Sequence, residues 1–276
     1  MLAMSEINLK KRNGKPGWKW SYLVYFVLQT GLVAVVYYLF AAKGFLVPSV
    51  VYWLVIAMVT LAIILMALGI FKKNISYIWW EALLLLFAFC GVWILCLAVL
   101  PLWAAVMVAA LLTVLPYLWP LTFWHDFSFL MGTLGVGLFA AIQFPFPVLL
   151  LVAAGIAIYE YLRLNQTQLA TLYSEAFRAG LPPGILLPVS PSGWFRSIER
   201  TWQAGEGIIL GLLPAIILAA VGLRVLRHGP LWLMLFGLLE CLVIVVFGQD
   251  KQNRLRSWIF LAIAVAFYAF TGWLPL

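Results

Sequence analysis

The sequence predicts an all-α membrane protein with nine transmembrane helices and a cytoplasmic N-terminus. The first observation is composition: 66% of the 276 residues are hydrophobic, 9% are charged, and the mean hydropathy is +1.09. A soluble domain of this size would expose too much apolar surface to stay in solution. The second is that the apolar residues fall into runs of the length, about 20 residues, that a helix needs to cross a bilayer.

The apolar runs give nine predicted spans, near residues 19–42, 47–71, 76–99, 102–120, 127–144, 146–163, 206–225, 230–248 and 256–274. The third and fourth runs are separated by little more than Pro101, so eight spans is the alternative.

The basic residues favour nine spans. With the N-terminus inside, this count places fourteen Lys and Arg residues on the cytoplasmic side and three (Lys43, Arg224 and Arg227) on the other. Such asymmetry is the positive-inside bias, and dropping one early span would destroy it. The net charge of +8 therefore lies in loops beside the bilayer and does not indicate nucleic acid as a partner. We expect a multi-pass protein with the C-terminus outside, in the plasma membrane of a prokaryote.

One long loop divides the chain into a six-span block, 1–163, a cytoplasmic amphipathic loop, 164–205, and a three-span block, 206–276. Apolar residues at spacings of three and four predict an amphipathic helix over 165–178. A Gly- and Pro-rich break follows, and then Ile185–Val189 reads as a short extended apolar segment.

Two carboxylates at the edges of predicted spans are the candidate chemistry. Glu160 lies about 15 residues into the sixth span, or roughly 22 Å from its far-side start. Glu206 opens the seventh span from the cytoplasmic side, so both acids are predicted at one depth. An acid inside a membrane is a functional-site hypothesis by default. Paired carboxylates that share a proton can activate water against a peptide bond, whereas the structural alternative is two interior polar groups that lock helix packing.

Several motifs resemble one known family. They are Trp124-His125-Asp126, the glycine-rich run Gly132, Gly135 and Gly137, the segment Ala157-Ile158-Tyr159-Glu160-Tyr161, Gln168-Leu169-Ala170, and Leu181-Pro182 followed by Leu187-Pro188-Val189. At this spacing the chain resembles the archaeal presenilin-like branch of the GxGD intramembrane aspartyl proteases. The resemblance is clearest from about residue 124 to 189.

The resemblance implies the presenilin-like fold and an endopeptidase that cleaves transmembrane-helix substrates. Glu160 and Glu206 stand at the catalytic positions, between spans six and seven. Tyr159, Gly205, Gly207, Leu187 and Pro188 would contact the substrate, and Ile185–Val189 would pair with it by strand addition. No metal or organic cofactor is implied. The expected partners are a transmembrane helix or bound membrane peptide and the lipid bilayer, with the oligomeric state open.

The chain departs from the family at both acids. Glu replaces Asp at Glu160, and the second motif reads Gln203-Ala204-Gly205-Glu206; an alternative alignment places Ile208 at the acid position. The family's Pro-Ala-Leu motif at the start of the ninth span is absent, because residues 254–260 hold no proline. Three functions stay open: a Glu/Glu protease, an inactive pseudoprotease that binds membrane helices or peptides, and a small-molecule permease.

Other polar and small residues have simpler interpretations. Asp126 is expected as the N-cap of a helix from Phe127 onward, and its neighbour His125 lacks the third ligand of a metal site. The three glycines Gly132, Gly135 and Gly137, and the pair Gly207 and Gly211, predict close helix packing.

Overall fold

The computed structural model describes residues 18–43, 53, 57, 77–145, 147–149, 151, 154–155, 184–188, 191–203, 207–226 and 229–247, and these are mostly helical. The predicted ninth span, nearly all of the second and most of the sixth lie outside these residues. So does the predicted amphipathic helix at 165–178.

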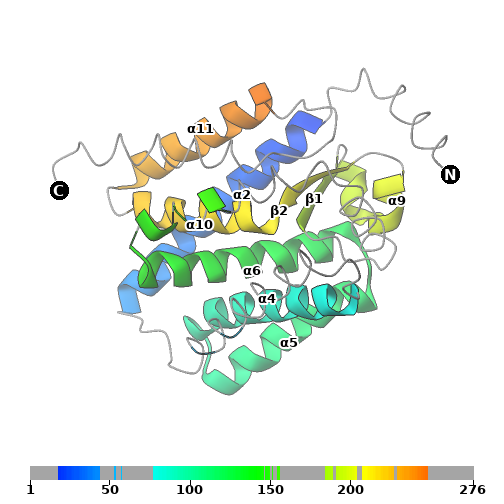
Figure 1. Ribbon diagram of the computed structural model, residues 1–276, viewed down its shortest axis with the longest axis horizontal. Coiled ribbons are helices and arrows are strands. Elements are labelled where there is room, and N and C mark those ends of the chain that lie inside the picture. Colours follow the sequence, from blue (N-terminus) through cyan, green and yellow to red (C-terminus); the bar gives the residue numbers. More distant parts are fainter. Residues whose placement is uncertain are drawn as a thin grey trace.

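The described helices and strands are arranged in space as Figure 1 shows. In chain order they are α2 (Trp18–Lys43), α4 (Tyr77–Leu97), α5 (Leu102–Leu118), α6 (Thr122–Gln143), β1 (Gly184–Pro188), the 3-10 helix η1 (Pro191–Phe195), α9 (Ile198–Gln203), β2 (Gly207–Gly211), α10 (Leu212–Val225) and α11 (Pro230–Phe247). Helices α2, α4, α5 and α11 match predicted spans within about two residues. A turn at 98–101 separates α4 from α5, as the nine-span count requires.

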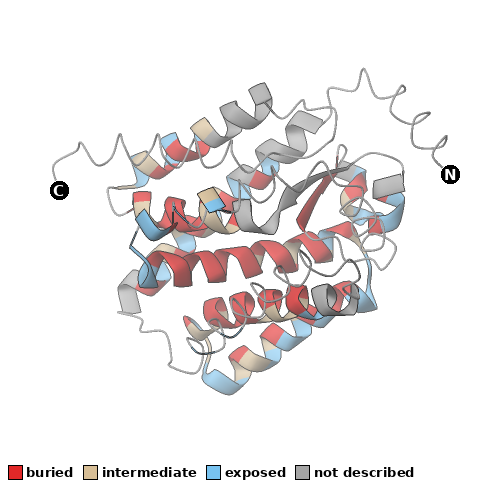
Figure 2. Cartoon of the chain, viewed as in Figure 1, coloured by how far each residue is buried: buried red, intermediate tan, exposed pale blue. Residues whose placement is uncertain are grey.

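Among the described residues, one helix, α6, is both long enough and apolar enough to cross a bilayer. The number of crossings therefore stays a prediction. Helix α6 also occupies the centre of the molecule, with α4 and α5 on one side and α10 on the other (Figure 1). It is buried almost from end to end, whereas α5 turns an exposed face outward (Figure 2).

Small residues let helices approach α6 closely. A Cβ added at Gly91 of α4 would overlap the carbonyl oxygen of Gly132, and one added at Gly135 would overlap the carbonyl of Gly91. On the opposite side, a Cβ at Gly137 would lie 2.7 Å from the Cβ of Ala219 on α10. The predicted packing role of the three α6 glycines is confirmed.

Helices α6 and α10 run in the same direction. At their C-terminal ends, the Arg224 guanidinium on α10 donates hydrogen bonds to the carbonyls of Ala141, at 2.8 Å, and Phe144. These carbonyls lie at the end of α6, where no further helical N–H reaches them, and a cation there also complements the helix dipole. The N-terminal ends of both helices therefore meet at the β-sheet.

Helix α5 contains Pro116, and α6 compensates for it. Proline has no N–H, so the carbonyl of Leu112, four residues earlier, lacks its usual intrahelical donor. The Ser128 hydroxyl on α6 donates to that carbonyl at 2.6 Å. A backbone group that the proline leaves unpaired is thus paired between helices, as an apolar environment demands.

The seventh span begins differently from the prediction. Residues 207–211 form strand β2, and the helix starts only at Leu212. Glycine at both ends weakens a helix there, and the β-branched Ile208 and Ile209 favour a strand. Pairing with β1 supplies the hydrogen bonds that a helix would otherwise make. The prediction that Gly207 and Gly211 form a helix-packing pair is therefore wrong.

Candidate functional site

The candidate site is a two-stranded antiparallel sheet at the N-terminal ends of α6 and α10. Gly184 of β1 lies opposite Gly211 of β2, Leu186 opposite Ile209, and Pro188 opposite Gly207. All five residues of β1 are buried. The predicted extended segment at Ile185–Val189 is thus confirmed as a strand, displaced by one residue toward the N-terminus.

An acidic side chain of α6 occupies the outer edge of β1. The backbone N–H of Leu186 donates to Oδ1 of Asp126 at 2.7 Å, across 60 residues of sequence. Successive residues of a strand direct their N–H groups to opposite edges, so Leu186 points away from β2 while Ile185 and Leu187 point toward it. Pro188 shares the outer edge with Leu186, which suits a residue that has no N–H to donate.

The register also fixes the direction of the β2 backbone. Ile209 faces Leu186 in a pair that exchanges no hydrogen bonds with it, so the N–H and C=O of Ile209 point away from β1. The sheet has two strands in the described part of the chain, and no described strand lies on that side of β2. The outer edge of β2, centred on Ile209, is therefore where a third strand would add.

Asp126 is held in a buried setting by its neighbour. His125 is 0% exposed and Asp126 is 3% exposed, and Nδ1 of His125 lies 3.2 Å from Oδ1 of Asp126. The His125 ring also stacks on Phe129, with centroids 4.4 Å apart. Oδ1 takes both contacts, while Oδ2 has no hydrogen-bond partner among the described residues.

The prediction that Asp126 caps a helix at Phe127 is wrong. Helix α6 begins one turn earlier, at Thr122, with Leu121 as its N-cap, so Asp126 lies within the helix. Its carboxylate accepts a hydrogen bond from β1 and not from its own helix, because the N–H that it binds is that of Leu186. A local sequence pattern cannot reveal this partner; the available signal was a lone acid beside a histidine at the start of an apolar run.

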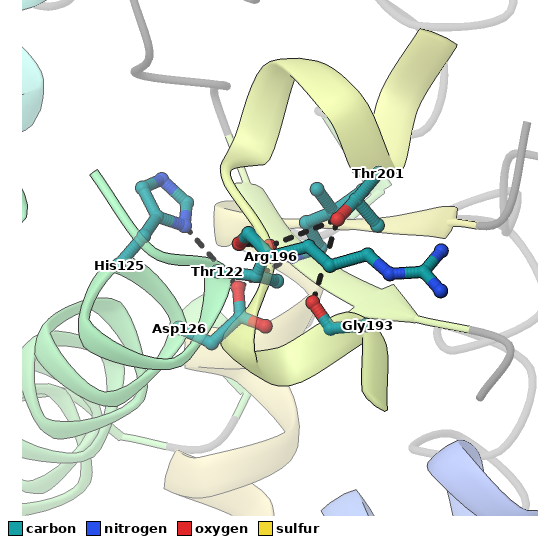
Figure 3. Close-up of polar contacts among 7 residues, drawn as sticks. Thr122, His125, Asp126, Gly193, Arg196 and Thr201 are labelled. Atoms are coloured by element: carbon teal, nitrogen blue, oxygen red, sulfur yellow. Dashed lines mark hydrogen bonds and ion pairs between the residues drawn. The ribbon is translucent and has the colours of Figure 1, made fainter. Parts of the chain in front are cut away.

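The segment 191–203 packs against the start of α6 and fixes the site from the other side. Thr122 donates from both its N–H, at 3.0 Å, and its hydroxyl, at 3.1 Å, to the carbonyl of Arg196. Figure 3 shows Thr122 and Asp126 on α6 beside Gly193, Arg196 and Thr201 of this segment. The Thr201 hydroxyl lies 3.3 Å from that of Thr122 and also bonds carbonyls of its own segment.

Glycine is required where this segment meets the sheet. A Cβ added at Gly193 would lie 2.5 Å from the Cβ of Pro188, closer than real Cβ atoms approach. The 3-10 helix η1 therefore packs tightly against the end of β1.

Of the predicted site residues, the structure brings three together. Leu187 and Pro188 lie in β1, and Gly207 lies opposite Pro188 in β2. Glu160, Glu206, Tyr159 and Gly205 lie outside the described residues. Glu206 immediately precedes Gly207 in the chain, so the second candidate acid adjoins the start of β2 and not the start of a helix.

That β1 itself pairs with a substrate stays a prediction, and in this structure both edges of the strand have partners within the chain. One edge of β1 is bonded to β2 and the other faces Asp126. The described residues contain no group of three His, Cys, Asp or Glu side chains placed to hold a metal ion.

The chain was compared with family models, curated proteins and solved structures, and nothing in any of the three sets matches it.

Proposed function

We propose that this chain is a presenilin-like membrane protein that binds extended peptide segments at the β1–β2 sheet and does not cleave them. The observation that carries the proposal is the sheet itself. A two-stranded sheet, of which strand β1 is buried, sits at the ends of two apolar helices, and its β2 edge directs the Ile209 backbone outward.

A membrane setting is supported by the surface of α5. Its exposed side chains are large and apolar and recur at helical spacing, at Trp103, Met107, Leu111, Val114 and Leu118. A continuous apolar stripe of this kind suits contact with lipid acyl chains better than contact with water.

Strand addition suits a peptide in this setting. A transmembrane segment that unwinds loses its internal hydrogen bonds, and each unpaired backbone group in hydrocarbon costs several kcal/mol. The outward N–H and C=O of Ile209 would pair with such a segment as a third strand. The flanking Gly207 and Gly211 carry no side chains, which leaves room on the face that they share with Ile209 for larger side chains of the bound segment.

The positions of the acids favour binding without hydrolysis. Residues 207–226 contain no Asp or Glu, so α10 carries no carboxylate of its own. Glu206 is separated from α10 by the whole of β2, about 17 Å of extended chain. In addition, each Asp-to-Glu change moves a carboxylate by about one C–C bond, beyond the roughly 0.5 Å tolerance of a catalytic arrangement.

Proteolysis by Glu160 and Glu206 is the second candidate, and the motif Tyr159-Glu160-Tyr161 favours it. In that case the two glutamates would share a proton and activate a water molecule. The two functions share the same bound peptide and differ in whether the peptide bond breaks.

The binding test uses a fluorescein-labelled peptide with a Leu/Ala transmembrane core, a central Gly-Gly and Lys ends, titrated into the protein in lipid nanodiscs. The key variant is Ile209→Pro, which removes the outward N–H without removing a bond to β1, since proline is tolerated at an edge with its nitrogen facing outward. We expect binding to weaken about tenfold in Ile209→Pro, the effect of one lost hydrogen bond with an unpaired partner, and to persist in Ile209→Val. Equal affinities for wild type and Ile209→Pro would contradict strand addition at β2.

Mass spectrometry of the same peptide after long incubation separates the two functions. Binding without new fragments is the result expected from the proposal. Fragments that disappear in both Glu160→Gln and Glu206→Gln would establish the glutamate pair as catalytic and overturn the proposal. Peptide cleavage that appears only in the Glu160→Asp/Glu206→Asp double variant would support a protease fold in which the native glutamates are inactive.

A further inference from the structure

Asp126 carries a role that neither the resemblance nor the proposed function assigns. From its contacts we infer that the Asp126 carboxylate is a positioning residue that closes the outer edge of β1 and so directs an incoming strand to β2. The inference rests on the proposed function for its consequence in binding, whereas the closure of the edge stands on geometry alone.

Closure follows from the donors that β1 offers on its outer side. Gly184, Leu186 and Pro188 share that side, and the proline has no N–H. The central donor, Leu186, is bonded to Asp126 at 2.7 Å. An incoming strand would find no free N–H on the outer edge of β1 from Leu186 to Pro188. To bond the Leu186 N–H it would have to displace the Asp126 carboxylate, a stronger acceptor than a peptide carbonyl.

Burial makes this hydrogen bond consequential. Leu186 is 0% exposed and Asp126 is 3% exposed, so water cannot replace either partner. His125 holds the carboxylate from the other side through the same oxygen, Oδ1. One carboxylate oxygen of α6 thus accepts a hydrogen bond from β1 and is itself in contact with His125.

The unpartnered Oδ2 provides a matched pair of variants. Asn keeps an oxygen that can accept the Leu186 N–H and places its NH₂ group where Oδ2 has no partner among the described residues. Leu has the same branched arrangement of heavy atoms, although it is larger, and it has no acceptor. Thr133→Val is the control, because the Thr133 hydroxyl is buried on the same helix and bonds the Leu130 carbonyl without touching β1.

The experiment is hydrogen exchange of the full-length protein in nanodiscs, resolved to single residues by fragmentation in the mass spectrometer. In wild type, we expect the Leu186 amide to exchange as slowly as those of Ile185 and Leu187. In Asp126→Leu, Leu186 alone should exchange about tenfold faster, whereas Asp126→Asn and Thr133→Val should keep the wild-type pattern.

The exchange rates of the three neighbouring β1 amides show whether Asp126 bonds Leu186 specifically or only stabilises the whole strand. If all three amides accelerate together in Asp126→Leu, the residue supports only the stability of the strand and the inference is overturned. If Asp126→Leu does not fold, the wild-type pattern still decides, because fast exchange at Leu186 beside slow neighbours would show that its N–H is not bonded.

A second experiment tests where the peptide binds. The labelled transmembrane peptide, now carrying a photo-crosslinker at its centre, should attach near Ile209 in wild type and also near Leu186 in Asp126→Leu. Crosslinking to β1 in wild type would overturn the inference. Absence of peptide binding with the exchange pattern intact would count against the proposed function alone.

Discussion

Single polar side chains in this protein pair with backbone groups that its own elements leave unpaired. Ser128 bonds the Leu112 carbonyl opposite Pro116, Asp126 bonds the Leu186 N–H, and Arg224 bonds carbonyls at the end of α6. In each case the partner is backbone from another element. Since an unpaired buried backbone group costs about 1–3 kcal/mol, these few residues matter more than their number indicates.

Ser128→Ala should lower the free energy of unfolding by about 1–3 kcal/mol, because the Leu112 carbonyl would lose the donor that replaces the missing Pro116 N–H. Thr113→Val is the matched control. The Thr113 hydroxyl bonds the Ala109 carbonyl of its own helix, which already has a backbone donor, so its loss should cost less.

A double-mutant cycle with Pro116→Ala tests the mechanism by unfolding in a denaturing detergent. Alanine restores the N–H, so Ser128→Ala should cost less in that background than in wild type. Equal costs in the two backgrounds would contradict the compensation by Ser128.

At the scale of elements, glycine decides how the helices pack. The α4–α6 contact brings Gly91 against the backbone of Gly132 and Gly135, so at Gly91 backbone meets backbone. Dispersion contacts between closely packed backbones are a principal source of helix association in lipid, where the hydrophobic effect between helices is absent. At Gly207 and Gly211 the same residue type instead weakens a helix, and the segment between them pairs with β1 as a strand.

Gly91→Ala should destabilise the protein by about 1–3 kcal/mol, since the added Cβ would overlap the Gly132 carbonyl and force α4 away from α6. Gly222→Ala is the control: its Cβ would lie 3.5 Å from Leu233 Cδ1, an ordinary contact. That variant should be neutral, or more stable by up to about 1 kcal/mol through helix propensity. Thermal unfolding in detergent measures both, and equal losses would argue that the α4–α6 approach is not the cause.

At the scale of the whole molecule, three helices run in the same direction, as the nine-span prediction expects of the third, fifth and seventh spans. Gly91 and Ala88 of α4 lie against Gly135 and Gly132 of α6, so these helices run in parallel, and α6 is parallel to α10 as well. The third, fifth and seventh of nine spans must all run from the cytoplasmic side outward. The site, at the N-terminal ends of α6 and α10, would then lie toward the cytoplasm.

This orientation is testable with a fluorescent protein that matures only in the cytoplasm. Fusion at the N-terminus should fluoresce, and fusion at the C-terminus should remain dark, because nine spans place the two ends on opposite sides. A fusion in the 164–205 loop should fluoresce and serves as the internal control. Fluorescence from both termini would support an even number of spans and contradict the nine-span prediction.

The sequence by itself determined four of the helices, α2, α4, α5 and α11, and the extended segment before η1. Their signals are local: runs of about 20 apolar residues, a proline between α4 and α5, and glycine or proline on either side of Ile185–Val189. These patterns predicted α2, α4, α5 and α11 to within about two residues because each helix satisfies its own backbone hydrogen bonds.

Only the tertiary structure decided the sheet and the residues that hold it. Whether residues 207–211 form a helix or a strand depends on a partner about twenty residues away, and the role of Asp126 depends on one 60 residues away. Neither partner leaves a periodic trace in the sequence. A buried N–H must find an acceptor wherever the fold places one, and in this fold Asp126 of α6 lies beside Leu186 of β1.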